Sequence, residues 1–85
     1  MEINELRKRI DRVDEGIVSL LAQRMEIVDS IAAIKKKQDI PMLDAGREEQ
    51  IHERLGGLAV GKGLRPEFVS SLYEKILAES KRNRL

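Results

Sequence analysis

Apolar residues recur every three or four positions along the N-terminal part of the chain, and two later segments repeat this spacing. The N-terminal stripe consists of Leu6, Ile10, Val13, Ile17, Leu20, Leu21, Ile27, Val28 and Ile31. At ~100° per residue, these positions gather on one side of a single helix. We predict this helix from about Ile3 to Gln38, because Pro41 disfavours α geometry at Ile40.

The predicted first helix is too long for a compact chain of 85 residues. It would be a rod of roughly 54 Å at ~1.5 Å per residue. A globular domain of this size has a radius of gyration near ~12 Å and is only about 30 Å across. Because the apolar stripe continues along most of the rod, we expect a second copy of the chain to cover it. The pattern therefore predicts an obligate homodimer.

Two shorter helices are predicted after the proline. Asp44 is a good N-cap for the first, which continues to about Val60 and is followed by Gly61 and Gly63. Its buried stripe is expected to be Ile51, Leu55 and Leu58. The last helix begins at Pro66, which suits a first turn, and reaches nearly to Leu85. Its inward residues are expected to be Val69, Leu72, Ile76 and, in part, Tyr73 and Leu77. With no strand pattern, the predicted fold is all-α, with three helices in one domain over residues 1–85.

Charged residues occupy positions on these apolar faces. Arg24 lies at the centre of the N-terminal stripe, and Lys35, eleven residues later, lies within about 20° of it around the helix axis. A cation that faces a core is costly unless an anion meets it. On the second helix, Arg47 and Glu48 straddle the apolar stripe, one turn before Ile51.

The ends of the chain add three more polar candidates. Ser80 continues the Ile76 face of the third helix, and Arg84 follows four residues later. Arg7 lies about 100° from Arg24 around the first helix, so one chain could not readily use both arginines in one cavity. In a dimer, Arg7 could serve the cavity of the partner.

Each candidate also has an ordinary structural interpretation. An arginine in such a stripe often forms a structural ion pair or extends its charged end to solvent. Lys35 opens the run of lysines at 35–37, and cations at a helix end favour the helix dipole. His52, four residues after Glu48, is expected to form a surface pair with it. Together, however, Arg24, Lys35 and Arg47 converge on one interior with a single obvious carboxylate, which suits a small molecule with two negative charges.

The composition argues against several other kinds of site. The 16 Lys and Arg residues against 15 Asp and Glu leave a net charge of +1, which is low for a nucleic-acid binder. With no Cys and one His, neither a disulfide framework nor a metal cluster is expected. No apolar run approaches the ~18 residues of a membrane span, and no signal peptide is recognisable. We expect a cytoplasmic protein with no metal, cofactor, nucleic-acid or membrane partner.

The residues described above resemble the all-helical class of chorismate mutases, including its short bacterial and archaeal members. The similarity covers essentially all 85 residues. It rests on segments 6–14 (LRKRIDRVD) and 20–24 (LLAQR), on Ile31, Ile34, Lys35, Ile40 and Pro41, and on segment 44–48 (DAGRE). No single segment is specific for this family. The combined spacing of the cations, and of the acid after the proline break, is specific for it.

The resemblance implies an intertwined homodimer with two equivalent sites, in which chorismate rearranges to prephenate during phenylalanine and tyrosine biosynthesis. By position, Arg24, Lys35 and Arg47 would bind the two carboxylates of chorismate, with Arg7 supplied by the other subunit. Glu48 would hold the ring hydroxyl, and the loop at Asp44 would contribute at the same end of the substrate. Ser80 would contact a carboxylate, and Ile31 and Leu77 would form apolar walls. The catalytic residues would be Lys35, Arg24 and Glu48.

The C-terminus departs from the family pattern. The family usually has glutamine, sometimes glutamate, where this chain has Arg84, and the third helix normally continues further. Arg84 could then donate to the ether oxygen of the substrate together with Lys35, or the C-terminal turn could fray and leave the site incomplete. Certain short members gain activity by docking on 3-deoxy-D-arabino-heptulosonate-7-phosphate synthase, and the resemblance extends this partner to the present chain.

Three alternatives stay open on the sequence alone. An isochorismate-pyruvate lyase of the same fold needs a similar set of cations. A non-enzymatic helical interaction module would use the interior charges to set its register. A regulatory subunit with weak activity of its own would be consistent with the short C-terminus.

Overall fold

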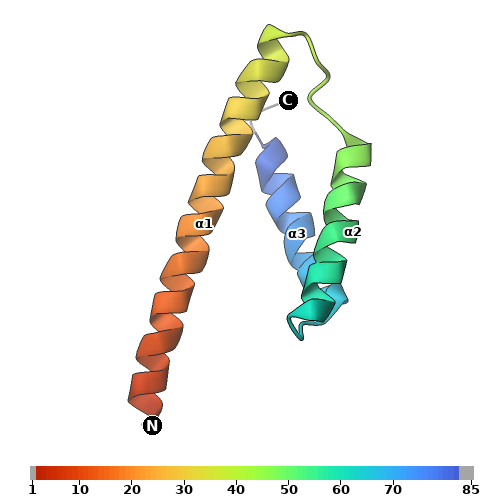
Figure 1. Cartoon of the computed structure of the whole chain (residues 1–85). Helices are drawn as coiled ribbons and strands as arrows, with labels where there is room; N and C mark the ends of the chain where they lie inside the picture. The colour runs from red at the N-terminus through yellow and green to blue at the C-terminus, as the bar shows by residue number, and fades with distance from the viewer. Residues whose placement is uncertain (1, 83–85) are drawn as a thin grey trace. The chain divides into compact units, whose positions relative to one another are not determined.

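The computed structural model describes residues 2–82, which form three α-helices and no strand. The helices are α1 (Ile3–Lys37), α2 (Ala45–Gly61) and α3 (Pro66–Lys81) (Figure 1). The predicted all-α fold class, with one very long first helix, is confirmed. Among the helices of residues 2–82, none combines the length and apolar character needed to cross a membrane.

The chain divides into two compact units, Met1–Ile31 and Ala32–Leu85. The first unit contains most of α1. The second contains the last turns of α1 together with α2 and α3. The assignment of residues 1–85 to a single domain stays a prediction.

The long helix α1 has an uncovered apolar stripe. Its 35 residues make it roughly 52 Å long at ~1.5 Å per residue. No residue between Ile3 and Lys37 is buried in the single chain. Leu21 and Val28 are half-buried, and the exposed fractions of the other stripe residues range from 42% at Leu6 to 66% at Leu20. Most of the stability of a helix with this pattern comes from packing its apolar stripe against another surface.

The end of α1 is close to the predicted one. The helix ends at Lys37, one residue before the predicted Gln38. Asp39 then adopts a positive φ of 57°, and the Ile40 N–H donates to the Lys35 carbonyl at 2.8 Å. This bond closes the last turn before Pro41, where the helix could not have continued.

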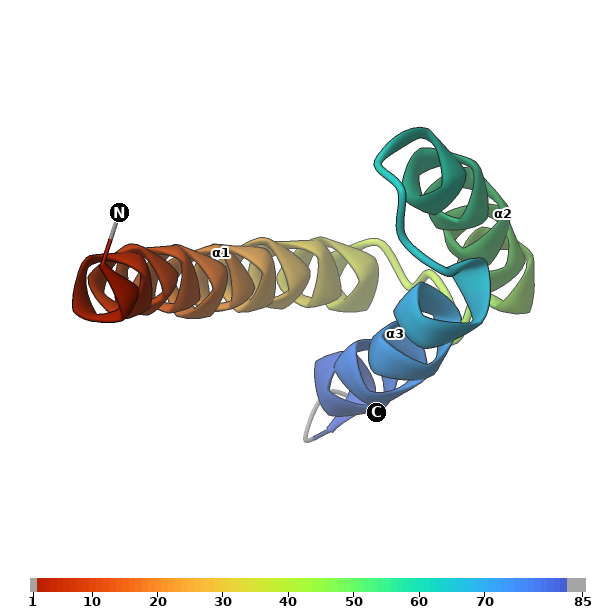
Figure 2. The same ribbon diagram turned by 90° about the horizontal axis from the view of Figure 1, so that it is seen from below.

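Helices α2 and α3 pack side by side as an antiparallel pair (Figures 1 and 2). The buried apolar residues among those described are Ile51, Ala59 and Leu77. Ile51, the half-buried Leu55 and Ala59 lie four residues apart on one row of α2. Val69, Tyr73 and Leu77 form the corresponding row of α3. Rows with this spacing form the ridges by which helices interlock.

Two predicted core positions are wrong for the single chain. Leu58 and Leu72 are 49% and 47% exposed, whereas the neighbouring Ala59 is buried. Each helix turns its row of residues spaced by four toward its neighbour, so the leucine next to that row points away. Leu77, predicted to face inward only in part, is the buried residue of α3.

The turn between α2 and α3 confirms the role predicted for its glycines. Gly63 has a φ of +74°, which a residue without a Cβ adopts at little cost. The Leu64 N–H donates to the Ala59 carbonyl at 2.8 Å, and the Gly63 N–H donates to the Val60 carbonyl at 3.1 Å. These two bonds are those of a Schellman C-cap, and they end α2 at Gly61.

The start of α3 is as predicted, and its end is not. Pro66 occupies the first turn, where its missing N–H has no helical acceptor. The helix ends at Lys81, and Arg82 is already extended, with φ −64° and ψ 129°. The predicted continuation nearly to Leu85 is therefore wrong. Arg84 lies outside the described residues.

His52 on α2 contacts α3, not the acid predicted as its partner. Its Nδ1 lies 3.2 Å from the Oγ of Ser70, and both residues are half-buried. The predicted pair with Glu48 is wrong, because Glu48 is bound to a residue of α3. The His52–Ser70 contact is a polar link between α2 and α3.

Candidate functional site

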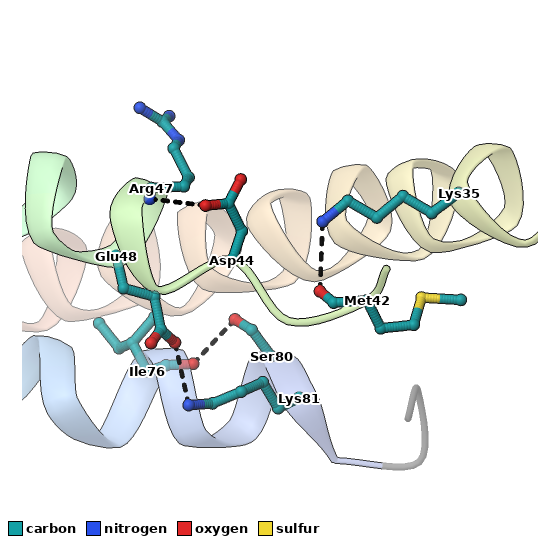
Figure 3. A network of polar contacts seen from close by, with 8 residues as sticks. All are labelled: Lys35, Met42, Asp44, Arg47, Glu48, Ile76, Ser80 and Lys81. Atoms are coloured by element: carbon teal, nitrogen blue, oxygen red, sulfur yellow. Dashed lines mark hydrogen bonds and ion pairs between the residues drawn. The ribbon is translucent and has the colours of Figure 1, made fainter. Parts of the chain in front are cut away.

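Five polar candidates among the described residues lie in the second unit, at the end of α1, the start of α2 and the last turn of α3. Figure 3 shows Lys35, Asp44, Arg47, Glu48 and Ser80 with their polar contacts. Arg7, Arg24 and Ile31 lie on α1 within the first unit, and Leu77 is the buried residue of α3.

Lys35 lies in the last turn of α1 and is half-buried. Its Nζ donates a hydrogen bond to the Met42 carbonyl at 3.2 Å, across the loop that leads to α2 (Figure 3). An ammonium has three donors, so this bond leaves two for other acceptors. Lys35 is thus held toward the α1–α2 loop by a neutral partner that does not cancel its charge.

The first turn of α2 is organised by Asp44. Its Oδ1 accepts a hydrogen bond from the Arg47 backbone N–H at 2.9 Å, which confirms the predicted N-cap (Figure 3). The cap fixes the direction in which α2 starts, and with it the positions of Arg47 and Glu48. The contribution of Asp44 to a substrate stays a prediction, since the observed role of its carboxylate is structural.

Arg47 and Glu48 follow each other in the chain but point in different directions. The Arg47 side chain is exposed and extends away from Glu48 (Figure 3). Glu48 turns to α3, where its Oε1 lies 2.9 Å from the Nζ of Lys81. The predicted convergence of the Arg47 cation with the Glu48 carboxylate is not present in this arrangement.

Lys81 is the ion-pair partner of the candidate residue Glu48, and sequence reasoning missed it. The lysine is at the C-terminal end of α3, where a cation is ordinarily attributed to the helix dipole. A signal was nevertheless present, because Lys81 is one helical turn after Leu77 and so extends the inward row of α3. The candidate acid Glu48 therefore has a cationic partner, Lys81, that lies 33 residues later in the sequence.

Ser80 and Leu77 border the same end of α3. The Ser80 hydroxyl donates to the Ile76 carbonyl at 2.8 Å and is half-buried. This bond is local to the helix, four residues back along the chain. Leu77 is 7% exposed and anchors the turn that carries both Ser80 and Lys81.

On α1, the two candidate arginines are far apart. Arg7 is exposed and Arg24 is half-buried. Because seventeen residues separate them on a continuous helix, their Cα atoms are roughly 25 Å apart along the axis. A molecule of the size of a substituted cyclohexadiene cannot bind both arginines from one chain. Ile31, the predicted apolar wall, is 47% exposed.

The candidate residues of the second unit and the partner of Glu48 include more cations than acids. Within residues 2–82, no three His, Cys, Asp or Glu side chains are grouped so that they could hold a metal ion. The side chains assembled in the second unit are three cations, Lys35, Arg47 and Lys81, with two acids, Asp44 and Glu48. Both acids already have partners, Asp44 in the cap and Glu48 in the ion pair.

The profile of the chorismate mutase type II family matches residues 6–84, which span nearly the whole chain. The chain belongs to this family. A chorismate mutase of Methanocaldococcus jannaschii is 28% identical over 80 residues, which are 94% of this chain and 81% of that protein. The chain is also similar to a solved chorismate mutase of Thermus thermophilus, with a TM-score of 0.88 and 29% identity over 96% of this chain and 92% of that one.

Other relatives are larger or carry a different substrate in their name. A bifunctional chorismate mutase/prephenate dehydratase of Buchnera aphidicola is 33% identical over 79 residues, 93% of this chain and 20% of that protein. A 4-amino-4-deoxychorismate mutase of Streptomyces pristinaespiralis is 29% identical over 78 residues, 92% of this chain and 60% of that protein. The chain thus spans a fifth of the length of the first of these relatives and three fifths of the length of the second.

Proposed function

We propose that this protein is a chorismate mutase, an isomerase that converts chorismate to prephenate for the biosynthesis of phenylalanine and tyrosine. The observation that best supports the proposal is that the family match covers residues 6–84 and therefore includes every candidate site residue. The similarity to the Methanocaldococcus jannaschii chorismate mutase, over most of both chains, supports it further. The cytoplasm is the expected location, in keeping with that pathway.

The reaction is an intramolecular rearrangement that needs no nucleophile and no external acid or base. The ether C–O bond between the ring and the enolpyruvyl arm breaks while a C–C bond forms, and the electron pairs shift in one cycle. The protein must hold the arm over the ring and stabilise the charge that develops on the ether oxygen. Both tasks suit a site made of fixed cations.

Lys35 is the residue proposed to stabilise the transition state. As the C–O bond lengthens, negative charge develops on the ether oxygen, and the Lys35 ammonium stabilises this charge more than the ground state. One preorganised donor of this kind typically lowers the activation free energy by about 3–4 kcal/mol. The bond to the Met42 carbonyl supports the role, because it orients the ammonium while leaving two donors for substrate.

The carboxylates of chorismate are proposed to bind Arg24, Lys35 and Arg47, assisted by Ser80 and Arg84, with Arg7 from the partner subunit. Guanidinium groups grip a carboxylate through two parallel hydrogen bonds and so hold its plane. Glu48 is proposed to accept a hydrogen bond from the ring hydroxyl. Ile31 and Leu77 are proposed to border the ring. Arg47 must turn from its present outward direction to take part.

A homodimer is proposed as the working form. The uncovered stripe of α1 and the exposed Leu58 and Leu72 supply apolar surface that a second copy would cover. The separation of Arg7 and Arg24 supports a shared site, because a substrate bound at Arg24 can meet an Arg7 only from another chain. Docking on 3-deoxy-D-arabino-heptulosonate-7-phosphate synthase remains a further proposed interaction.

One assay tests the activity against its rivals. Purified protein is given chorismate, isochorismate or 4-amino-4-deoxychorismate, and the loss of each is followed by ultraviolet absorbance with the products identified by chromatography. We expect prephenate from chorismate as the fastest reaction. Release of pyruvate from isochorismate at a higher kcat/KM would assign the lyase function instead. No conversion of any substrate, with or without added synthase, would favour an interaction module.

A further inference from the structure

The ion pair between Glu48 and Lys81 joins the first turn of α2 to the last turn of α3. The distance from Oε1 to Nζ is 2.9 Å, and the side chains are 34% and 40% exposed, respectively (Figure 3). Pairs between two mobile surface side chains contribute little, but here both backbones are fixed. Asp44 caps the turn that contains Glu48, and the buried Leu77 anchors the turn that contains Lys81.

The pair changes what Glu48 can bind. A carboxylate accepts about four hydrogen bonds, so the bond to Lys81 leaves capacity for a further donor. The pair as a whole has no net charge. A neutral hydroxyl needs only an acceptor and is bound by either a free or a paired carboxylate. A primary amine is protonated near neutral pH, and its positive charge would be attracted by Glu48 and repelled by Lys81.

We propose that Lys81 is a specificity-determining residue that acts through Glu48. By pairing with this carboxylate, it favours a ring substituent that is a neutral hydroxyl over a protonated amine at the same position. The inference rests on the proposed function, in which Glu48 meets the ring substituent. Chorismate and 4-amino-4-deoxychorismate differ in this substituent, and the names of the relatives show that both kinds of mutase occur among similar chains.

The test compares kcat/KM for chorismate and 4-amino-4-deoxychorismate in the wild-type chain and in Lys81→Met. Methionine keeps most of the length of the side chain and removes the charge. We expect the ratio of chorismate to amine kcat/KM to fall about three- to thirtyfold, the range for loss of one unit charge near a partly exposed site. Where the amine reacts too slowly, its competitive inhibition constant in the chorismate assay replaces its kcat/KM.

Two further variants separate specificity from structure. Lys81→Arg keeps the charge and should keep the ratio near that of the wild type. Lys75→Met removes an exposed lysine from the same helix and should leave the ratio unchanged. A purely structural role for the ion pair would lower both reactions together and not move the ratio. Circular dichroism checks that each variant is folded, and Lys81→Gln replaces Lys81→Met if that variant is not.

The outcomes distinguish this inference from the proposed function. An active wild type whose ratio is the same in Lys81→Met overturns the role of Lys81 alone. A wild type that converts neither substrate overturns the proposed function and this inference with it. A ratio that falls in Lys81→Met and stays constant in Lys81→Arg and Lys75→Met supports both.

Discussion

Lys35 shows at the scale of one residue how a cation can be held without being neutralised. The Met42 carbonyl fixes the direction of the ammonium at 3.2 Å, and as a neutral dipole it leaves the positive charge in place. Glu48 is treated differently, because its nearest partner is the charged Lys81. The residues proposed to meet the ether oxygen and the ring hydroxyl therefore differ in how much of their charge a substrate would meet.

Replacing Lys35 by alanine should lower kcat for chorismate by roughly a hundredfold or more, the loss typical for one preorganised donor. The measurement is the initial rate of chorismate loss at saturating substrate. Lys36→Ala is the matched control, since Lys36 is exposed in the same turn and should keep most of the activity. A Lys35→Ala protein with near-normal kcat would refute the proposed role in the transition state.

The same scale shows what residue types reveal in advance. The spacing of the charged candidates along the chain and the N-cap at Asp44 are local properties, and they were predictable. The ion pair of Glu48 was not, because its partner lies 33 positions away, from 48 to 81, and is brought close only when α2 packs on α3.

At the scale of elements, the ends of the helices follow from short-range chemistry. Helix ends leave backbone N–H and C=O groups without a helical partner. Asp44 accepts a hydrogen bond from one such N–H, Gly63 allows the turn that caps the end of α2, and Pro66 has no N–H to satisfy. Such signals act over three or four residues, which is why α1 and α2 end close to where the sequence predicts. The end of α3 was predicted too late, because the signal from Asn83, a residue type that is common just beyond helix ends, was not used.

Replacing Asp44 by alanine should lower the free energy of unfolding by about 1 kcal/mol, through loss of the cap on α2. Urea titration followed by circular dichroism measures the change. Asp44→Ser keeps a capping oxygen and should recover most of the stability. Equal losses in the two variants would show that the bond to the Arg47 N–H contributes nothing.

The same substitution should have opposite effects at two glycines. Gly63→Ala places a Cβ on a residue with positive φ and should cost about 1–2 kcal/mol. Gly57→Ala, in the interior of α2 with open space around its Cβ position, should stabilise the protein by about 0.5–1 kcal/mol. Thermal unfolding of both variants checks the signs. A stabilising Gly63→Ala would contradict the C-cap described for α2.

At the scale of the whole molecule, α1 is the helix in which the single chain buries no residue. Its apolar stripe is exposed along a rod of roughly 52 Å, and Arg7 and Arg24 are too far apart to share a ligand. Both facts are explained if a second copy lies along α1 and each site takes residues from two chains.

Mixing inactive variants tests this arrangement. Arg7→Ala and Arg24→Ala homodimers should each be strongly impaired. After subunit exchange they should regain about a quarter of the wild-type activity, because half of the dimers are mixed and one of their two sites is intact. Exchange is verified by native mass spectrometry. As the control, Arg7→Ala is mixed with the double variant Arg7→Ala/Arg24→Ala, and this mixture should regain no activity. If the mixture of Arg7→Ala with Arg24→Ala also regains no activity, a shared site is excluded.

The sequence by itself determined the three helices, most of their ends, the family and the places of the candidate residues along the helices. These depend on apolar periodicity and on backbone groups within one turn, which the chain encodes locally. Only the tertiary structure decided that Ala59 and not Leu58 is buried, that His52 contacts Ser70, and that Glu48 is paired with Lys81. Those outcomes depend on which rows of α2 and α3 interlock, and that register is set by the packing of both helices together.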